Sequence, residues 1–343
     1  MRKYLDYSVE QILALCAIPS PSGYTKKASE YLISELIALG YSPSVSNKGA
    51  VLVELGGTGE PLVISAHVDT LGAMVRSINA QGRLQLTMIG GYPENYVESE
   101  NCVIHTRCGK QYSGCILLKN PAVHVNREIA DTKRNFANME VVIDEKVATV
   151  EDVKKLGISA GDFVSLDPRT VLTTSGFIKS RHLDDKAGSG LLLGVAKYFA
   201  SHKMTLGRKV YLFFTVYEEV GHGGACGFPA DVREMLVVDM GAVGDDLGAS
   251  EHVVSICAKD SRSPYDYDVT NKLIATAKTH KLEYAVDIYP FYGSDAAAAL
   301  AAGHDIRHGL IGPGVAASHG YERTHVDGLE NTLKLIIEYI KRE

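Results

Sequence analysis

Histidines and carboxylates that could hold a metal ion follow several apolar segments of this chain. The set comprises His67, Asp69, Asp184, Asp185, Glu218, Glu219, Asp239 and His319. Imidazole nitrogens combined with carboxylate oxygens make a mixed site that suits zinc, cobalt or manganese. Each short motif also has a plainer explanation, because adjacent aspartates are favourable at any helix N-terminus and a single His-x-Asp is common. Their shared position at strand ends favours one metal site.

The glutamate pair illustrates why the position matters. Glu218 and Glu219 follow the apolar segment 210–216, which reads Val-Tyr-Leu-Phe-Phe-Thr-Val, and Asp239 ends a similar segment. Carboxylates that leave a buried strand are costly unless they are paired or bound to a metal. Neighbouring residues of an extended segment point in different directions. One glutamate could therefore bind a metal ion while the other faces the substrate as a general base.

Strands that alternate with helices are predicted to carry these residues. A first helix is predicted from a capping box at Ser8 and Gln11 to Pro19. The other predicted helices cover residues 25–39, 185–202, 264–281, 294–302 and 326–341, and the strands cover 50–55, 62–66, 210–216, 235–238, 284–289 and 307–311. This alternation indicates an α/β fold with a mostly parallel mixed sheet flanked by helices. Ligands of such sheets gather at the carboxyl ends of the strands.

The pattern changes between residues 71 and 163. Short alternating segments separated by turn-rich pieces indicate a mainly β region, with one short helix over 150–156 that Thr149 caps. A chain of 343 residues exceeds the usual size of one compact domain. We therefore predict a discontinuous catalytic domain, residues 1–70 and 164–343, with a β-rich domain inserted at 71–163.

Composition excludes several classes of function. The net charge of -6 argues against a general nucleic-acid binder, which would carry a basic stripe. No run of about 18 apolar residues is present, so no membrane span is expected. The N-terminal stretch lacks an export-type cleavage site, and the six cysteines form no C-x-x-C pair. These features predict a cytoplasmic protein with reduced thiols.

Taken together, the motifs resemble the M42 family of dinuclear metallo-aminopeptidases, which includes glutamyl and tetrahedral aminopeptidases. The matching motifs are His67-x-Asp69, Arg-His-Leu-Asp-Asp-Lys-Ala-Gly at 181–188, Glu-Glu-Val-Gly at 218–221, Asp239 and His319. Gly-Ser-Asp-Ala at 293–296 resembles another segment that lines the family's site. The order and spacing agree over nearly the whole chain, including the inserted β-rich segment. The resemblance implies a fold of the zinc-exopeptidase type.

The resemblance also implies a set of metal ligands. Two divalent ions per chain are expected, with zinc preferred over cobalt or manganese. Asp184 would bridge the two ions. His67 and Asp239 would complete one site, and Glu219 and His319 would complete the other.

A mechanism and an assembly follow from the same resemblance. Glu218 would be the general base for a metal-bound hydroxide that cuts N-terminal residues from short peptides with a free amino terminus. Asp69 would orient His67 through a hydrogen bond, without binding a metal ion itself. Family members assemble through the inserted domain, so a homo-oligomer is expected, built from dimers up to a tetrahedral dodecamer.

Local departures from the family bear on specificity. Many members carry an Arg-Tyr pair shortly before the last histidine, whereas residues 311–322 read Ile-Gly-Pro-Gly-Val-Ala-Ala-Ser-His-Gly-Tyr-Glu. This stretch resembles a branch associated with the synthesis of small amidated peptide osmolytes. His182 stands where relatives often have a small residue. His325 is an alternative to His319 as the ligand. Arg262 and Arg307 are candidates for recognising an acidic substrate side chain, or for surface ion pairs.

Other functions remain open at this point. The same metals could serve a deacylase or deamidase of small N-acylated amino acids or dipeptides. A glycosidase is disfavoured, because Glu218 and Glu219 are adjacent, whereas its two carboxyl groups face each other across about 5–9.5 Å. A metal-binding assembly protein without activity would be expected to have lost its base or a ligand, and none is missing here.

Overall fold

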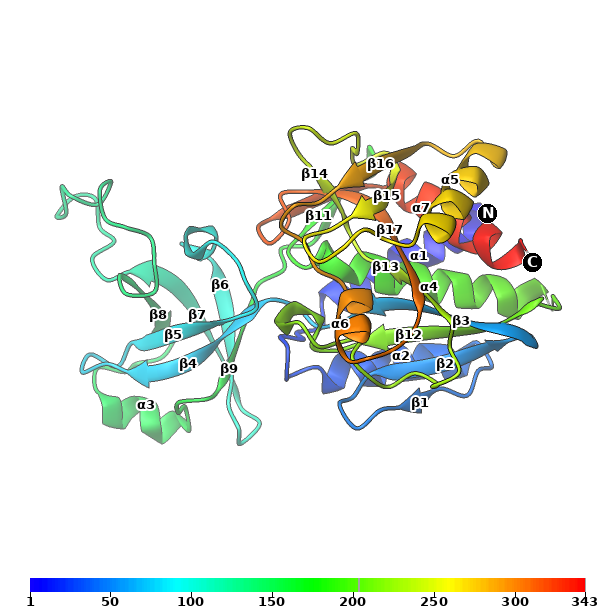
Figure 1. Cartoon of the computed structure of the whole chain (residues 1–343). Helices are drawn as coiled ribbons and strands as arrows, with labels where there is room; N and C mark the ends of the chain where they lie inside the picture. The colour runs from blue at the N-terminus through cyan, green and yellow to red at the C-terminus, as the bar shows by residue number, and fades with distance from the viewer. Residues whose placement is uncertain (203, 343) are drawn as a thin grey trace. The chain divides into compact units, whose positions relative to one another are not determined.

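The computed structural model describes residues 1–202 and 204–342 (Figure 1). The chain forms two compact units. Unit 1 consists of Met1–Asp69 and Arg169–Glu343, and unit 2 consists of Thr70–Pro168. Each unit has a hydrophobic core of its own. Within the described part of the chain, no helix combines the length and the apolar character needed to cross a bilayer.

Unit 1 is built on a large mixed sheet. Its strand order is β1 (Ser44–Val45), β2 (Val51–Gly56), β12 (Arg208–Thr215), β3 (Gly59–His67), β13 (Glu234–Val238), β17 (Arg307–Ala316), β18 (Glu322–His325), β11 (Phe177–Ser180) and β10 (Val171–Leu172). Two further strands pair with β17, β14 (Gly241–Val243) and β15 (Val254–Lys259), and β16 (Tyr284–Ile288) pairs with β15. The predicted parallel pairing holds at the centre, from β12 through β3 and β13 to β17. Strands β2 and β18 pair with their neighbours in the antiparallel sense, and β15 is antiparallel to β17 but parallel to β16.

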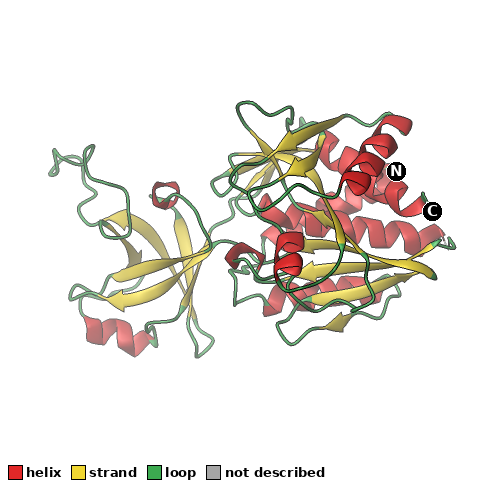
Figure 2. Cartoon of the chain, viewed as in Figure 1, coloured by secondary structure: helices red, strands yellow, loops and turns green. Residues whose placement is uncertain are grey.

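Helices lie against this sheet, as the red and yellow elements of Figure 2 show. They are α1 (Arg2–Cys16), α2 (Lys26–Ala38), α4 (Leu183–His202), α5 (Tyr267–Thr279), α6 (Asp295–Ala301) and α7 (Val326–Lys341). In α7 the apolar residues Leu329, Leu333 and Ile336 recur at helical spacing and are fully buried. This period explains why the predicted bounds of α7 agree with the structure. The mixed α/β fold class is thus confirmed.

The first helix was wrongly predicted to begin at Ser8. Helix α1 begins at Arg2, and Ser8 lies buried inside it, where its hydroxyl donates to the carbonyl of Tyr4 at 2.9 Å. Helix α1 packs on α4, and a Cβ added at Gly194 would lie 1.9 Å from Ser8 Oγ. Ser8 is therefore a small residue at a close helix contact and not an N-cap.

Strand β17 is longer than the sequence predicted. The predicted strand ended at residue 311, yet β17 continues through the Gly-Pro-Gly segment 312–314 to Ala316. A Cβ at Gly312 would lie 1.5 Å from the carbonyl oxygen of Asp239. Glycine at this position permits a close approach of two backbone segments. Glycines interpreted only as turn residues do not predict such an approach. The approach brings the chain around Asp239 against β17.

Unit 2 is a closed antiparallel barrel. The strands follow one another around it as β4 (Gly72–Ile78), β5 (Leu84–Ile89), β8 (Met139–Ile143), β7 (Gln111–Leu118), β6 (Asn101–His105) and β9 (Phe163–Leu166). Helix α3 (Val150–Leu156) has the predicted cap, because Thr149 Oγ1 accepts from the backbone N–H of Asp152 at 3.2 Å. Closure removes the open edges that an isolated sheet of this size would expose.

Candidate metal centre

The carboxyl ends of three central strands bring the predicted site residues together in unit 1. His67 is the last residue of β3, and it pairs in register with Thr215, the last residue of β12. Asp239 directly follows β13, the other parallel neighbour of β3. Because parallel strands end at the same edge of a sheet, their terminal side chains converge there.

The carboxylate of Asp184 lies between two imidazoles. Its Oδ1 is 2.9 Å from His67 Nε2, and its Oδ2 is 3.3 Å from His319 Nε2. Asp184 and Asp185 have non-helical backbone angles at the beginning of α4, and the peptide bond between them is cis. His319 reaches Asp184 from the segment between β17 and β18, with a left-handed backbone (φ 63°).

Two groups of potential metal ligands share Asp184. One group contains His67, Asp184 and Asp239, and the other contains Asp184, Glu219 and His319. Within each group the ligand atoms lie within 4.8 Å of one another. His319 is the most accessible of the five, with 35% of its side chain exposed. The arrangement could hold two cations on either side of one carboxylate.

The charge balance of these groups fits bound cations. Burial raises the pKa of Glu218 and Glu219 well above the ordinary value, and nearby carboxylates add to the effect. Burial, followed by the charge of Asp184, raises the pKa of Asp239 to about 7. Within residues 1–202 and 204–342, the buried Glu219 Oε1 has no hydrogen-bond partner. Buried carboxylates of this kind are stabilised by metal ions, and an imidazole and carboxylate donor set suits zinc.

The adjacent glutamates face different imidazoles. Glu218 Oε2 lies 3.8 Å from His67 Nε2, and Glu219 Oε2 lies 3.8 Å from His319 Nε2. Both belong to the short 3-10 helix η2 (Glu218–Val220), which follows Tyr217 in a left-handed conformation (φ 70°). The pair therefore places one carboxylate in the second ligand group and leaves the other beside the first group.

Asp69 contacts His67 mainly through its backbone carbonyl. His67 Nδ1 lies 2.9 Å from the backbone carbonyl oxygen of Asp69 and 3.6 Å from its carboxylate, so the nearer acceptor is the carbonyl. The carboxylate instead accepts the backbone N–H groups of Glu218 at 3.1 Å and Glu219 at 3.3 Å, and the hydroxyl of Ser22 at 2.5 Å. Asp69 thus orients His67 through its backbone and fixes the glutamate pair through its side chain.

Sequence reasoning missed Glu322. Its carboxylate is 1% exposed and accepts the backbone N–H groups of Asp184 and His319, each at 3.0 Å. Burial, together with the charge of Asp184, raises the pKa of Glu322 to about 8. A glutamate three residues after the predicted histidine was the available signal. Its role depends on a backbone group 138 residues away, which local patterns do not reveal.

Of the remaining sequence candidates, His182 lies beside the centre, whereas His325 and Arg307 lie elsewhere. His325 ends β18 and contacts Asp327 instead of Asp184, so His319 is the histidine that joins the predicted group. Burial, followed by the charges of Lys186 and Arg181, lowers the pKa of His182 to about 3. Arg307 forms an ion pair with Glu60 at the surface.

Comparisons with known proteins extend over most of the chain. A family profile described as M42 glutamyl aminopeptidase matches residues 49–335. The chain is 45% identical over 336 residues to YhfE of Bacillus subtilis (strain 168), covering 97% of each protein, and the name of that relative places it provisionally among aminopeptidases.

Two solved structures share the fold. One is a TET aminopeptidase from the marine sediment archaeon Thaumarchaeota archaeon SCGC AB-539-E09, with a TM-score of 0.88 and 21% identity over 98% of this chain and 96% of that one. The other is the Pyrococcus horikoshii TET1 peptidase, described as assembling into a tetrahedron or a large octahedral shell. Its TM-score is 0.85, with 24% identity over 98% of this chain and 100% of that one.

Proposed function

Because this chain belongs to the M42 peptidase family and is a metallo-aminopeptidase, we propose that it removes N-terminal residues at a centre of two divalent ions. The observation that carries the proposal is the Asp184 carboxylate, whose two oxygens face different histidines. His67 and Asp239 would complete the ligands of one ion, and Glu219 and His319 those of the other. The mixed donor set favours zinc, with cobalt or manganese as alternatives.

The residues around the centre support separate roles for the bound ions and for the side chains beside them. Bound ions would polarise the scissile carbonyl and increase the acidity of a water molecule. Glu218 would take the proton of that water and pass it to the leaving amine, as its position beside His67 allows. Asp69 would keep Glu218 in place through the backbone N–H that it accepts. Glu322 would hold the backbone of Asp184 and His319 in the same way.

Metal removal tests this function. We expect the stripped protein to be inactive and to regain activity as zinc, cobalt or manganese approaches two ions per chain, because both ligand groups would then be filled. The measurement is hydrolysis of a panel of free and N-blocked aminoacyl amides at each point of the titration. Turnover of free amines alone supports the aminopeptidase. Turnover of blocked amines alone would overturn it in favour of a deacylase.

The physiological substrate is proposed to be a short peptide with a free amino terminus. The segment around His319 differs from that of many family members, so the glutamyl preference in the family's name is not transferred to this chain. The same panel, extended with small amidated peptides, would identify the preferred N-terminal residue. Activity confined to the amidated peptides would narrow the proposal to them.

A homo-oligomer is the proposed state of the enzyme. The fold shared with the Pyrococcus horikoshii TET1 peptidase supports this, with unit 2 as the proposed assembly element and a dodecamer as one possible size. Light scattering should give a mass that is a multiple of 37.1 kDa. A monomer at micromolar concentration would contradict the proposal.

The cytoplasm is the proposed location. All six cysteines are free, and Cys16, Cys102 and Cys257 are buried. Free buried thiols are typical of proteins that work in a reducing compartment. Recovery of the protein in an exported or membrane fraction would contradict this location.

A further inference from the structure

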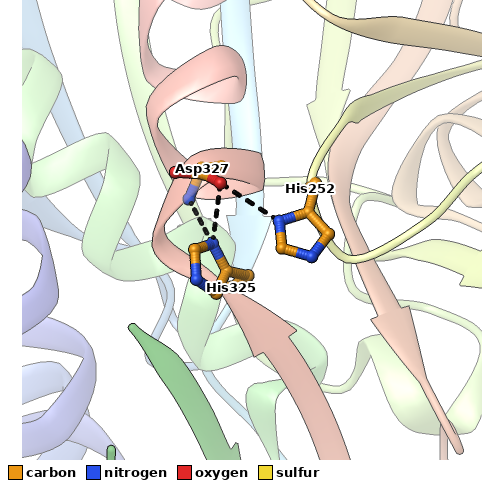
Figure 3. A group of neighbouring side chains, drawn as sticks. All are labelled: His252, His325 and Asp327. Atoms are coloured by element: carbon orange, nitrogen blue, oxygen red, sulfur yellow. Dashed lines mark hydrogen bonds and ion pairs between the residues drawn. The ribbon is translucent and has the colours of Figure 1, made fainter. Parts of the chain in front are cut away.

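A third group of potential metal ligands lies outside the candidate metal centre. It consists of His252, His325 and Asp327, whose ligand atoms lie within 4.8 Å of one another (Figure 3). His252 belongs to the segment between β14 and β15, His325 ends β18, and Asp327 lies in the first turn of α7. We propose that these three residues form an additional site, the third site, for one divalent transition-metal ion such as zinc.

The spacing of the ligand atoms fits such an ion. Asp327 Oδ2 lies 3.1 Å from Nδ1 of His252 and 3.1 Å from Nδ1 of His325. Tetrahedral zinc with bonds of about 2.0–2.1 Å separates its ligand atoms by about 3.3 Å. The corresponding distances around Asp184 are 2.9 and 3.3 Å. The third site is therefore as compact as the candidate metal centre.

The tautomer of His325 leaves its Nδ1 available. Its Nε2 lies 2.8 Å from the backbone carbonyl of Ser175, so Nε2 carries the hydrogen and donates it. Nδ1 then presents its lone pair toward Asp327, where it also accepts the backbone N–H of that residue at 3.1 Å. A carbonyl that accepts from the distal nitrogen is the usual outer partner of a metal-binding histidine. An ion at Nδ1 would take over the lone pair that now caps α7.

Packing holds the two imidazoles near each other. The ring of Phe177 lies edge-on to both, with centroid distances of 5.7 Å to His252 and 4.7 Å to His325. The two imidazole centroids are 4.4 Å apart. The side chain of Asn331 donates to the backbone carbonyl of His252 at 3.1 Å, which ties this segment to α7. Metal binding would therefore need little rearrangement of the three residues.

Access and charge also suit a cation. His252 and Asp327 line a surface pocket together with Glu283, Glu330 and Lys334, so ions reach the group from solvent. Glu330 and Lys334 form an ion pair at 2.7 Å and largely offset each other. The partial positive charge at the N-terminus of α7 repels a cation here, and the negative charge of Asp327 offsets that repulsion. The simpler alternative is a hydrogen-bonded cluster that caps α7 and holds no metal.

Occupancy of the third site would stabilise a strand that also serves the candidate metal centre. Strand β18 has 4 residues, with Glu322 at one end and His325 at the other. Glu322 accepts the backbone N–H groups of Asp184 and His319. An ion that joins His325 to His252 and Asp327 would therefore anchor the strand from which Glu322 acts.

The test compares zinc binding by the wild-type protein and the His252→Ala variant. Side chain 252 is 47% exposed, so its removal should leave the fold intact, which circular dichroism would verify. Both proteins are loaded with zinc, desalted and analysed for zinc by mass spectrometry. We expect the variant to hold one ion fewer per chain. Added zinc should also raise the melting temperature of the stripped wild-type protein more than that of the variant.

Two further variants make the result specific. Asp327→Asn should lose the same ion, whereas His124→Ala, which removes an exposed histidine of unit 2, should bind zinc like the wild-type protein. Equal zinc content in the wild-type, His252→Ala and Asp327→Asn proteins would overturn the third site. The comparison depends only on the difference between proteins. Its outcome is therefore independent of how many ions the candidate metal centre holds and of the proposed reaction.

Discussion

Replacing Glu218 by glutamine is expected to lower kcat by about 10²–10⁴-fold while both metal ions stay bound. Glutamine preserves the size of the side chain and removes its ability to accept a proton. The backbone N–H of residue 218 would still donate to Asp69, so the segment should keep its position. The measurement combines steady-state kinetics on a free aminoacyl amide with the zinc content of the purified variant.

The neighbouring glutamate provides the matched control. Glu219→Gln makes the same chemical change one residue away, on the side of His319. This variant should lose affinity for one ion, and excess zinc should restore part of its activity, whereas zinc should not rescue Glu218→Gln. Substantial turnover by a fully metal-loaded Glu218→Gln protein would show that another group is the base.

Replacing Asp184 by asparagine is expected to weaken both metal sites at once and to reduce activity below detection. The carboxylate offers one oxygen to the group with His67 and the other to the group with His319. An amide retains one weaker oxygen donor and turns an N–H₂ group toward the second position. Zinc content and the zinc-induced increase in melting temperature would both be measured, because an ion that binds only the folded state stabilises it.

The control for this variant is Asp245→Asn. Asp245 is exposed, so the same change of one negative charge should alter neither zinc content nor kcat there. If Asp184→Asn kept as many ions per chain as the wild-type protein and merely lost activity, the bridging role would be rejected. Asp184 would then act on the substrate and not on the metals.

Sequence patterns predicted the elements whose signals are local. Helices α3 and α7 have the predicted bounds, because a Thr149 cap and a regular apolar period lie within the elements themselves. Strands β15 and β18 were missed. They are defined by pairing with strands that lie far away in the sequence, β15 with β17 and β18 with β11. The extension of β17 was missed because glycine signals both turns and close approaches.

The candidate site was predictable to the extent that residue type indicates chemistry. His67, Asp184 and His319 were grouped from the sequence, and their side chains converge in the structure, although their roles as ligands stay predictions. The side chains that accept hydrogen bonds from backbone N–H groups of the site were not predictable. Asp69 and Glu322 act by accepting N–H groups from distant segments, and an acceptor of this kind has no signature in the sequence around it.

The division of the chain into two units has an evolutionary consequence. The chain leaves unit 1 at Asp69 and returns at Arg169, and every residue of the candidate metal centre belongs to unit 1. Substitutions and insertions within residues 70–168 therefore leave the identity of the candidate ligands unchanged. Lineages descended from one ancestor can diversify that region while the chemistry stays constant, which is how one fold comes to serve many physiological purposes.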